Sequence, residues 1–114
     1  VEGGFVQGAG WLTTEELVWD ASGRLRTHAP STYKIPAMSD RPREFNVSLW
    51  DRGNLKPTIY RSKAVGEPPF MLGISVWLAL SNAISQCGPS YPHLDAPATP
   101  EQVLAAIERA KHGL

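Results

Sequence analysis

A single carboxylate, Glu67, stands in the part of this chain whose residue types and spacing best suit chemistry. Gly66 precedes it, Pro68 and Pro69 follow it, and an apolar run comes next. Glycine lets another molecule approach the backbone closely, and the two prolines fix two φ angles and suit the opening of a helix. The pattern therefore predicts that Glu67 lies on a rigid elbow at a helix N-terminus, where a base is held in one position. The ordinary alternative is a helix-start residue that favours the helix dipole.

Gln7 is the second polar residue in a setting that suits a site. It lies among four glycines, and the apolar residues Phe5, Ala9 and Leu12 recur around it at helical spacing. So many glycines disfavour an isolated helix, but they let something large come close to this one. Tight packing between two helices uses glycine in the same way, so the pattern leaves both interpretations open.

The signatures of several other kinds of site are absent from the sequence. His28, His93 and His112 are isolated and Cys87 is the single cysteine, so no pair has the spacing of metal ligands. A nucleophile elbow, a phosphate loop and a dinucleotide fingerprint are also missing. Eleven basic residues balance eleven acidic ones, which favours no nucleic-acid partner. No run of about 18 apolar residues occurs, so we expect no membrane span.

The rest of the sequence predicts the elements that would hold these residues. An apolar segment over 70–86 predicts one buried central helix. Thr99 and Pro100, followed by Gln102, are typical of a helix start. Alternating or β-rich runs predict short strands, the first two joined as a hairpin, at 17–19, 24–27, 45–49 and 58–60. At 114 residues the chain is one domain. We therefore expect an α+β fold, with a small mixed or antiparallel sheet packed with two or three helices.

Four segments resemble, in the right order, the molybdenum-binding large subunit of the xanthine dehydrogenase and aldehyde oxidase family. The family's V-G-E-P-P segment matches the residues around Glu67, and its F-V-Q-G helix matches those around Gln7. Residues 30–36 read P-S-T-Y-K-I-P, and residues 95–101, D-A-P-A-T-P-E, resemble the tail of bacterial members. Residues 1–114 are thus identified as a C-terminal fragment of the molybdopterin-binding domain of a bacterial xanthine dehydrogenase.

The resemblance implies a role for three residues. Glu67 matches the base that takes a proton from the hydroxide on the molybdenum. Gln7 matches a glutamine that hydrogen-bonds beside the metal centre, and Gly66 would let the cofactor approach. No residue of this chain would ligate the metal, because the pterin carries it. The parent protein would hydroxylate xanthine or hypoxanthine.

The resemblance also implies the surroundings of this chain. Mo-molybdopterin would be the cofactor, and FAD and 2Fe-2S clusters would lie on other modules of a cytoplasmic parent, in bacterial members on a partner subunit. The rest of the molybdenum subunit would complete the purine pocket, so we expect the isolated chain to be inactive and without cofactor. Two alternatives stay open: a hydroxylase for another aldehyde or N-heterocycle, and a non-catalytic binding or assembly module that shares the fold.

Overall fold

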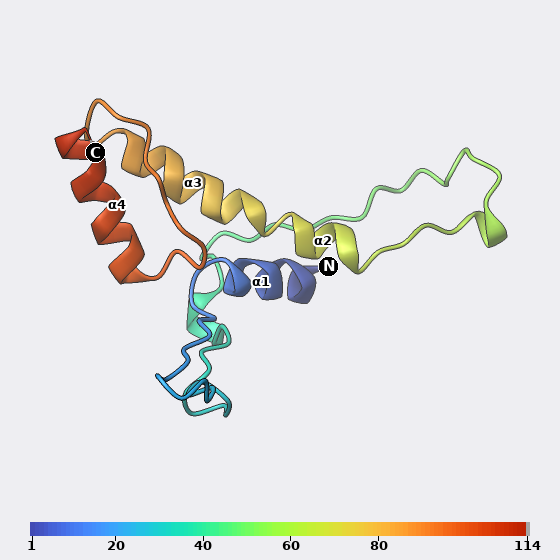
Figure 1. The fold of residues 1–114 in the computed structure, drawn as a ribbon. Coiled ribbons are helices and arrows are strands. Elements are labelled where there is room, and N and C mark those ends of the chain that lie inside the picture. Colours follow the sequence, from blue (N-terminus) through green and yellow to red (C-terminus); the bar gives the residue numbers. More distant parts are fainter. Residues whose placement is uncertain (114) are drawn as a thin grey trace.

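Helices dominate the computed structural model, which describes residues 1–113 (Figure 1). Two single 3₁₀ turns, η1 (Met38–Asp40) and η2 (Ile59–Arg61), lie in the long connection after the first helix. Residues 1–113 form four α-helices, which in chain order are α1 (Glu2–Trp11), α2 (Glu67–Met71), α3 (Ile74–Ser85) and α4 (Pro100–His112).

The predicted α+β fold with a small sheet is wrong for this chain. Over residues 1–113 the only β pairing is an isolated antiparallel bridge between Trp19 and Leu25, which is what remains of the predicted hairpin. Residues 45–49 are not paired in a sheet, and residues 58–60 run into the turn η2, where Tyr60 has a φ of 50°. An alternation of apolar and polar residues predicts the two faces of a strand. A strand also needs a neighbouring strand to hydrogen-bond with its backbone N–H and C=O groups. The described chain offers no such neighbour.

Glycines allow α1 to pack closely on α2 and on the start of α3. A Cβ at Gly8 would collide with the carbonyl oxygen of Phe70, and a Cβ at Gly73 would lie 2.5 Å from the backbone of Gly8. A Cβ at Gly4 would meet the Cβ of Pro69 at 3.2 Å. The backbones can approach this closely because these positions carry no side chain. Tight helix packing, one of the two uses that the sequence left open for these glycines, is therefore present in the structure.

The buried core lies at the other end of the molecule, between α3 and α4 (Figure 1). A Cβ at Gly88, just after α3, would collide with the carbonyl oxygen of Ala110, so a further glycine brings this segment against α4. Trp77, Leu80, Val103 and Ile107 pack around the core. The core itself consists of Ile84, Leu94, Ala98, Ala106 and Ala110.

Helix α4 begins and ends where the sequence predicts. The Oγ1 atom of Thr99 accepts a hydrogen bond from the backbone N–H of Gln102 at 3.4 Å, and Pro100 is the first helical residue. Gly113 ends the helix in the left-handed conformation, with a φ of 71°. Both ends follow from local capping chemistry.

The segment predicted to be one buried central helix is divided and largely exposed. Helix α2 ends at Met71 and α3 begins at Ile74. Ser81 and Ile84 are the buried residues of α3, whereas Leu78 is 52% exposed. The radius of gyration is 18.0 Å, compared with about 13 Å for a compact domain of similar length. An extended arm, residues 44–65, projects from the helices (Figure 1) and exposes Leu49, Trp50, Leu55, Ile59 and Tyr60.

One stretch, Glu67–Ser85, is long and apolar enough to cross a membrane by length and composition alone. These two properties do not separate a membrane span from helices packed inside a protein. Here the stretch includes the break between α2 and α3, Gly73 contacts α1, and Ile84 belongs to the core with α4. The structure therefore divides the stretch into two helices, each of which contacts another helix of the chain.

Replacing Gly8 by alanine tests the packing of α1. The new methyl group would overlap the Phe70 carbonyl oxygen, and overpacking of this kind typically costs about 1–3 kcal/mol of unfolding free energy. Thermal unfolding of the chain, followed by circular dichroism, would measure the loss.

Gly3→Ala is the matched control for this variant. It lies on the same helix, but its Cβ would meet nothing within 4 Å. Because alanine favours a helix over glycine, we expect Gly3→Ala to be neutral or stabilising. Equal melting temperatures for the two variants would contradict the glycine contact.

Candidate functional site

Glu67 is the first residue of α2, as the sequence predicts. Gly66 is the N-cap, and both prolines lie in the first turn. Pro69 is buried against the rest of the protein, whereas Gly66 and Glu67 are exposed. The backbone N–H of Phe70 donates to the carbonyl oxygen of Gly66 at 3.3 Å. The elbow therefore combines a constrained backbone with an accessible carboxylate.

Gln7 lies on the helix that packs against this elbow. It directly precedes Gly8, whose backbone contacts α2, and its side chain is exposed. A Cβ at Gly3, one turn earlier on the same face, or at Gly66 would meet nothing within 4 Å. The structure thus brings together the two helices that carry Gln7 and Glu67, although 59 intervening residues separate them in the sequence.

The two helices offer one carboxamide and one carboxylate, both exposed, with open space at Gly3 and at Gly66. Across residues 1–113, no three His, Cys, Asp or Glu side chains gather closely enough to hold a metal ion. A metal at this position would therefore carry ligands that these residues do not provide.

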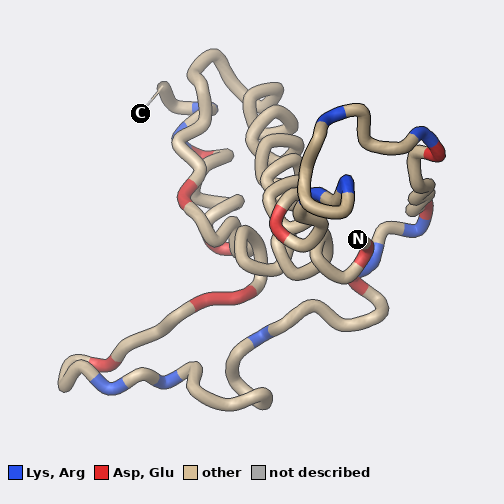
Figure 2. Tube along the Cα trace, turned by 90° about the vertical axis from the view of Figure 1, so that its right-hand side faces the viewer, with Lys and Arg blue, Asp and Glu red and all other residues tan. Residues whose placement is uncertain are grey.

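Acidic and basic residues are interspersed along the chain rather than gathered by sign (Figure 2).

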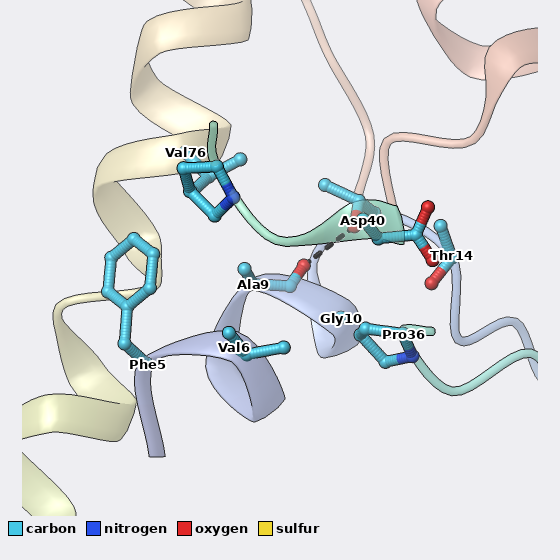
Figure 3. A pocket seen from close by; sticks show the side chains of 10 residues that line it. Phe5, Val6, Ala9, Gly10, Thr14, Pro36, Asp40 and Val76 are labelled. Carbon is cyan, nitrogen blue, oxygen red and sulfur yellow. Dashed lines mark hydrogen bonds between the residues drawn. The ribbon is translucent and has the colours of Figure 1, made fainter. Parts of the chain in front are cut away.

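An apolar pocket of about 140 Å³ lies between α1, the segment around Pro36, and α3 (Figure 3). Phe5, Val6 and Val76 contribute to its walls. The hydrogen bond drawn in Figure 3 joins the Thr13 hydroxyl to the carbonyl oxygen of Ala9 at 2.7 Å, just beyond the end of α1. Neither Gln7 nor Glu67 lines this pocket, so it is not where the candidate groups meet.

Glu15 is a candidate that sequence reasoning missed. Its side chain is buried, with 8% of the residue exposed, and among the described residues its Oε2 atom has no hydrogen-bond partner. Burial raises the pKa of Glu15 above its ordinary value, and a hydrogen bond with Tyr33 lowers it by less. In the sequence Glu15 stands beside Glu16, which is exposed. No local pattern separates the buried carboxyl from the solvated one.

Glu15 belongs to a set of contacts that fasten the end of α1 to residues 33–36. The hydroxyl of Thr14 donates to the carbonyl oxygen of Lys34 at 2.9 Å. A Cβ at Gly10 would lie 2.5 Å from the Cγ of Pro36 and 2.7 Å from the Oε2 of Glu15. The P-S-T-Y-K-I-P segment, to which the sequence assigned no chemistry, therefore braces the helix that carries Gln7.

Comparisons with known proteins agree with the motifs. Residues 1–42 match the model of the molybdopterin cofactor-binding domain. The chain is 46% identical to a xanthine dehydrogenase of Oryza sativa subsp. japonica, over 93% of this chain and 9% of that protein. It is 50% identical to a xanthine dehydrogenase/oxidase of Mus musculus and 47% identical to a xanthine dehydrogenase of Dictyostelium discoideum, in both cases over 90% of this chain and 8% of the relative. The predicted resemblance is confirmed, and the chain spans less than a tenth of these relatives.

The raised pKa of Glu15 predicts how stability depends on pH. The folded state holds the Glu15 proton more tightly than the unfolded state, whose pKa is near the ordinary 4.5. Stability from this group is therefore fully present below pH 4.5 and is lost as the pH rises through the folded pKa. We expect Glu15→Gln to raise the melting temperature at pH 7 and to change it little at pH 4.

The exposed neighbour provides the control, because Glu16→Gln removes the same charge from the surface. We expect it to leave the pH dependence of the melting temperature unchanged. A Glu15→Gln variant whose melting curve follows that of the wild type at both pH values would contradict the burial of this carboxyl.

Proposed function

Because this chain is related to xanthine dehydrogenases over at least 90% of its length, we propose that it forms one wall of the active site of a molybdenum hydroxylase. The observation that carries the proposal is the glycine contact between α1 and α2, which holds the helix of Gln7 against the elbow of Glu67. The substrate of the parent protein would be a purine such as xanthine or hypoxanthine. The names of the relatives support this substrate class.

Glu67 is the general base in this proposal. When bound, the molybdenum cofactor would supply a two-electron oxidation in which the oxygen atom comes from water. A carboxylate oxygen of Glu67 accepts a proton. That proton must leave the water-derived oxygen before the water-derived oxygen joins the electron-poor ring carbon. A general base must lie within hydrogen-bond reach of its proton, at about 2.6–3.2 Å. The constrained backbone at Gly66 and the two prolines suit that requirement, because they hold the carboxylate in a narrow range of positions.

Gln7 and Gly66 hold the cofactor in this proposal. The carboxamide of Gln7 has two N–H donors and one oxygen acceptor, so it can donate to a cofactor oxygen while accepting elsewhere. Gly66 leaves the space beside Glu67 open, which allows a bulky group to approach the backbone.

The remaining parts of the site would come from outside this chain. The rest of the molybdenum subunit would supply the other substrate contacts, and 2Fe-2S and FAD modules of a cytoplasmic parent would carry electrons away. The small share of the relatives' length that the chain covers supports this division. Its bacterial origin also stays a prediction. Neither nucleic acid nor a membrane has a role in this proposal.

Replacing Glu67 by glutamine in the full-length parent tests the base. Glutamine keeps the shape of the side chain but cannot take the proton, and the loss of a general base typically lowers the rate by about 10²–10⁴-fold. Turnover of xanthine should fall by this factor, whereas the molybdenum content should not change.

Glu101→Gln is the matched control, because Glu101 is likewise an acidic residue in the first turn of a helix. We expect this variant to retain wild-type turnover. A Glu67→Gln enzyme with a tenth or more of wild-type turnover would exclude Glu67 as the base. Full activity on an aldehyde or another N-heterocycle, without activity on purines, would favour the alternative substrate class.

The isolated 114-residue chain should bind no molybdenum cofactor and oxidise no purine. It holds only the Gln7 and Glu67 sides of the proposed site, and both side chains are exposed, whereas cofactor sites enclose most of their ligand. Metal analysis and a xanthine-dependent dye-reduction assay on the purified chain would measure both properties. Stoichiometric molybdenum, or turnover above that of a Glu67→Gln chain, would contradict the division of the site between this chain and the rest of the parent.

A further inference from the structure

The buried carboxyl of Glu15 requires a polar partner. Its Oε2 atom has none among the described residues, and a polar group that is buried without a hydrogen bond typically costs about 1–3 kcal/mol. Tyr33 meets the same carboxyl, so the unpartnered Oε2 atom defines where the missing partner must lie.

Two open pockets beside Glu15 offer polar side chains: one of about 330 Å³, lined by Gln102 on α4, and one on the side of α1. Glu15 and Gln7 line the same open pocket of about 250 Å³. Gly3, Gln7 and Gly10 share one face of α1, because their spacings of four and three residues match the helical turn. The other residues lining this pocket are Gly3, Val6, Ile35 and Pro36. Apart from Glu15 itself, Gln7 is therefore the lining residue of this pocket that has a polar side chain.

We propose that Glu15 is a positioning residue that orients the Gln7 carboxamide across this shared pocket and so fixes which end of the amide faces the cofactor. The proposal rests on the role of Gln7 in the proposed function. The link is a hydrogen bond between the two side chains, formed when the exposed carboxamide of Gln7 turns toward Glu15.

The contacts of Glu15 suit this task. Its backbone N–H donates to the carbonyl oxygen of Gly10 at 3.0 Å, and the Thr14–Lys34 hydrogen bond braces the preceding residue. The backbone that carries the carboxyl is therefore held in place. Either form of the carboxyl can bond to a carboxamide, because a carboxylate accepts from the amide NH₂ group and a protonated carboxyl donates to the amide oxygen. That hydrogen bond would decide which end of the symmetric-looking carboxamide faces the ligand.

A double-mutant cycle in the full-length parent tests the proposal. Glu15→Ala and Gln7→Ala are made singly and together, and each enzyme is assayed for kcat and KM with xanthine and for the rate of cofactor release in mild denaturant. We expect Glu15→Ala to lower kcat by about three- to tenfold and to speed cofactor release by a similar factor. In the Gln7→Ala background, Glu15→Ala should change either quantity by less than about twofold, because its partner is already gone.

Two further variants separate positioning from general stability. Glu15→Gln keeps both a hydrogen-bond acceptor and a donor at this place, so it should restore kcat to within about twofold of the wild type. Glu16→Ala removes the exposed neighbouring carboxylate and should change neither quantity. Effects of Glu15→Ala and Gln7→Ala that simply multiply, or a Glu15→Gln enzyme as impaired as Glu15→Ala, would overturn the proposal.

The failure of this proposal is distinguishable from the failure of the proposed function. Suppose that Glu67→Gln inactivates the parent but that the effects of Glu15→Ala and Gln7→Ala multiply. Then the proposed role of Glu15 is wrong, and the proposed hydroxylase function still holds. A parent that retains turnover after Glu67→Gln would overturn the base assignment, while the cofactor-release cycle would still report whether Glu15 acts through Gln7.

Discussion

The close approach of α1 to α2 and to the start of α3 is the constraint on which the rest of the site depends. It exists because Gly4, Gly8 and Gly73 carry no side chains where the backbones meet. Gln7 directly precedes one of these glycines, and Glu67 lies within the turn that contacts another. Any side chain in this contact would separate the helices, and with them the two polar groups proposed to act on one ligand.

Local chemistry could be predicted from the sequence, whereas pairing between distant segments could not. The elbow at Glu67 and both ends of α4 follow from prolines, a capping threonine and a glycine within a few residues. The strand predicted at 45–49 is absent because its ladder needs a second strand, and residues 1–113 provide none. The apolar run after Glu67 was also predicted as buried. Burial depends on what covers a helix, and in this chain the covering reaches only part of α3.

The candidate site shows the same division. Motifs identified Gln7 and Glu67 individually, but no spacing rule indicates that residues so far apart lie on touching helices. Glu15 was missed because the sequence around it does not distinguish it from its neighbour Glu16. The folded chain buries Glu15 and exposes Glu16. Its unpartnered oxygen is a property of packing, and it draws attention to Tyr33 and Lys34, which had no assigned role.

The contact between α1 and α2 also has a consequence for the order of folding. It closes a loop of about 60 residues that contains little regular structure, whereas the connection between α3 and α4, residues 86–99, is much shorter. Closing a long loop costs more chain entropy than closing a short one, and contacts distant in sequence form slowly. The α3–α4 hairpin is therefore expected to form early, and the contact between α1 and α2 last. The region proposed to hold the cofactor would then open at a lower free energy than the C-terminal helices, so hydrogen exchange would be fastest where the chemistry is placed.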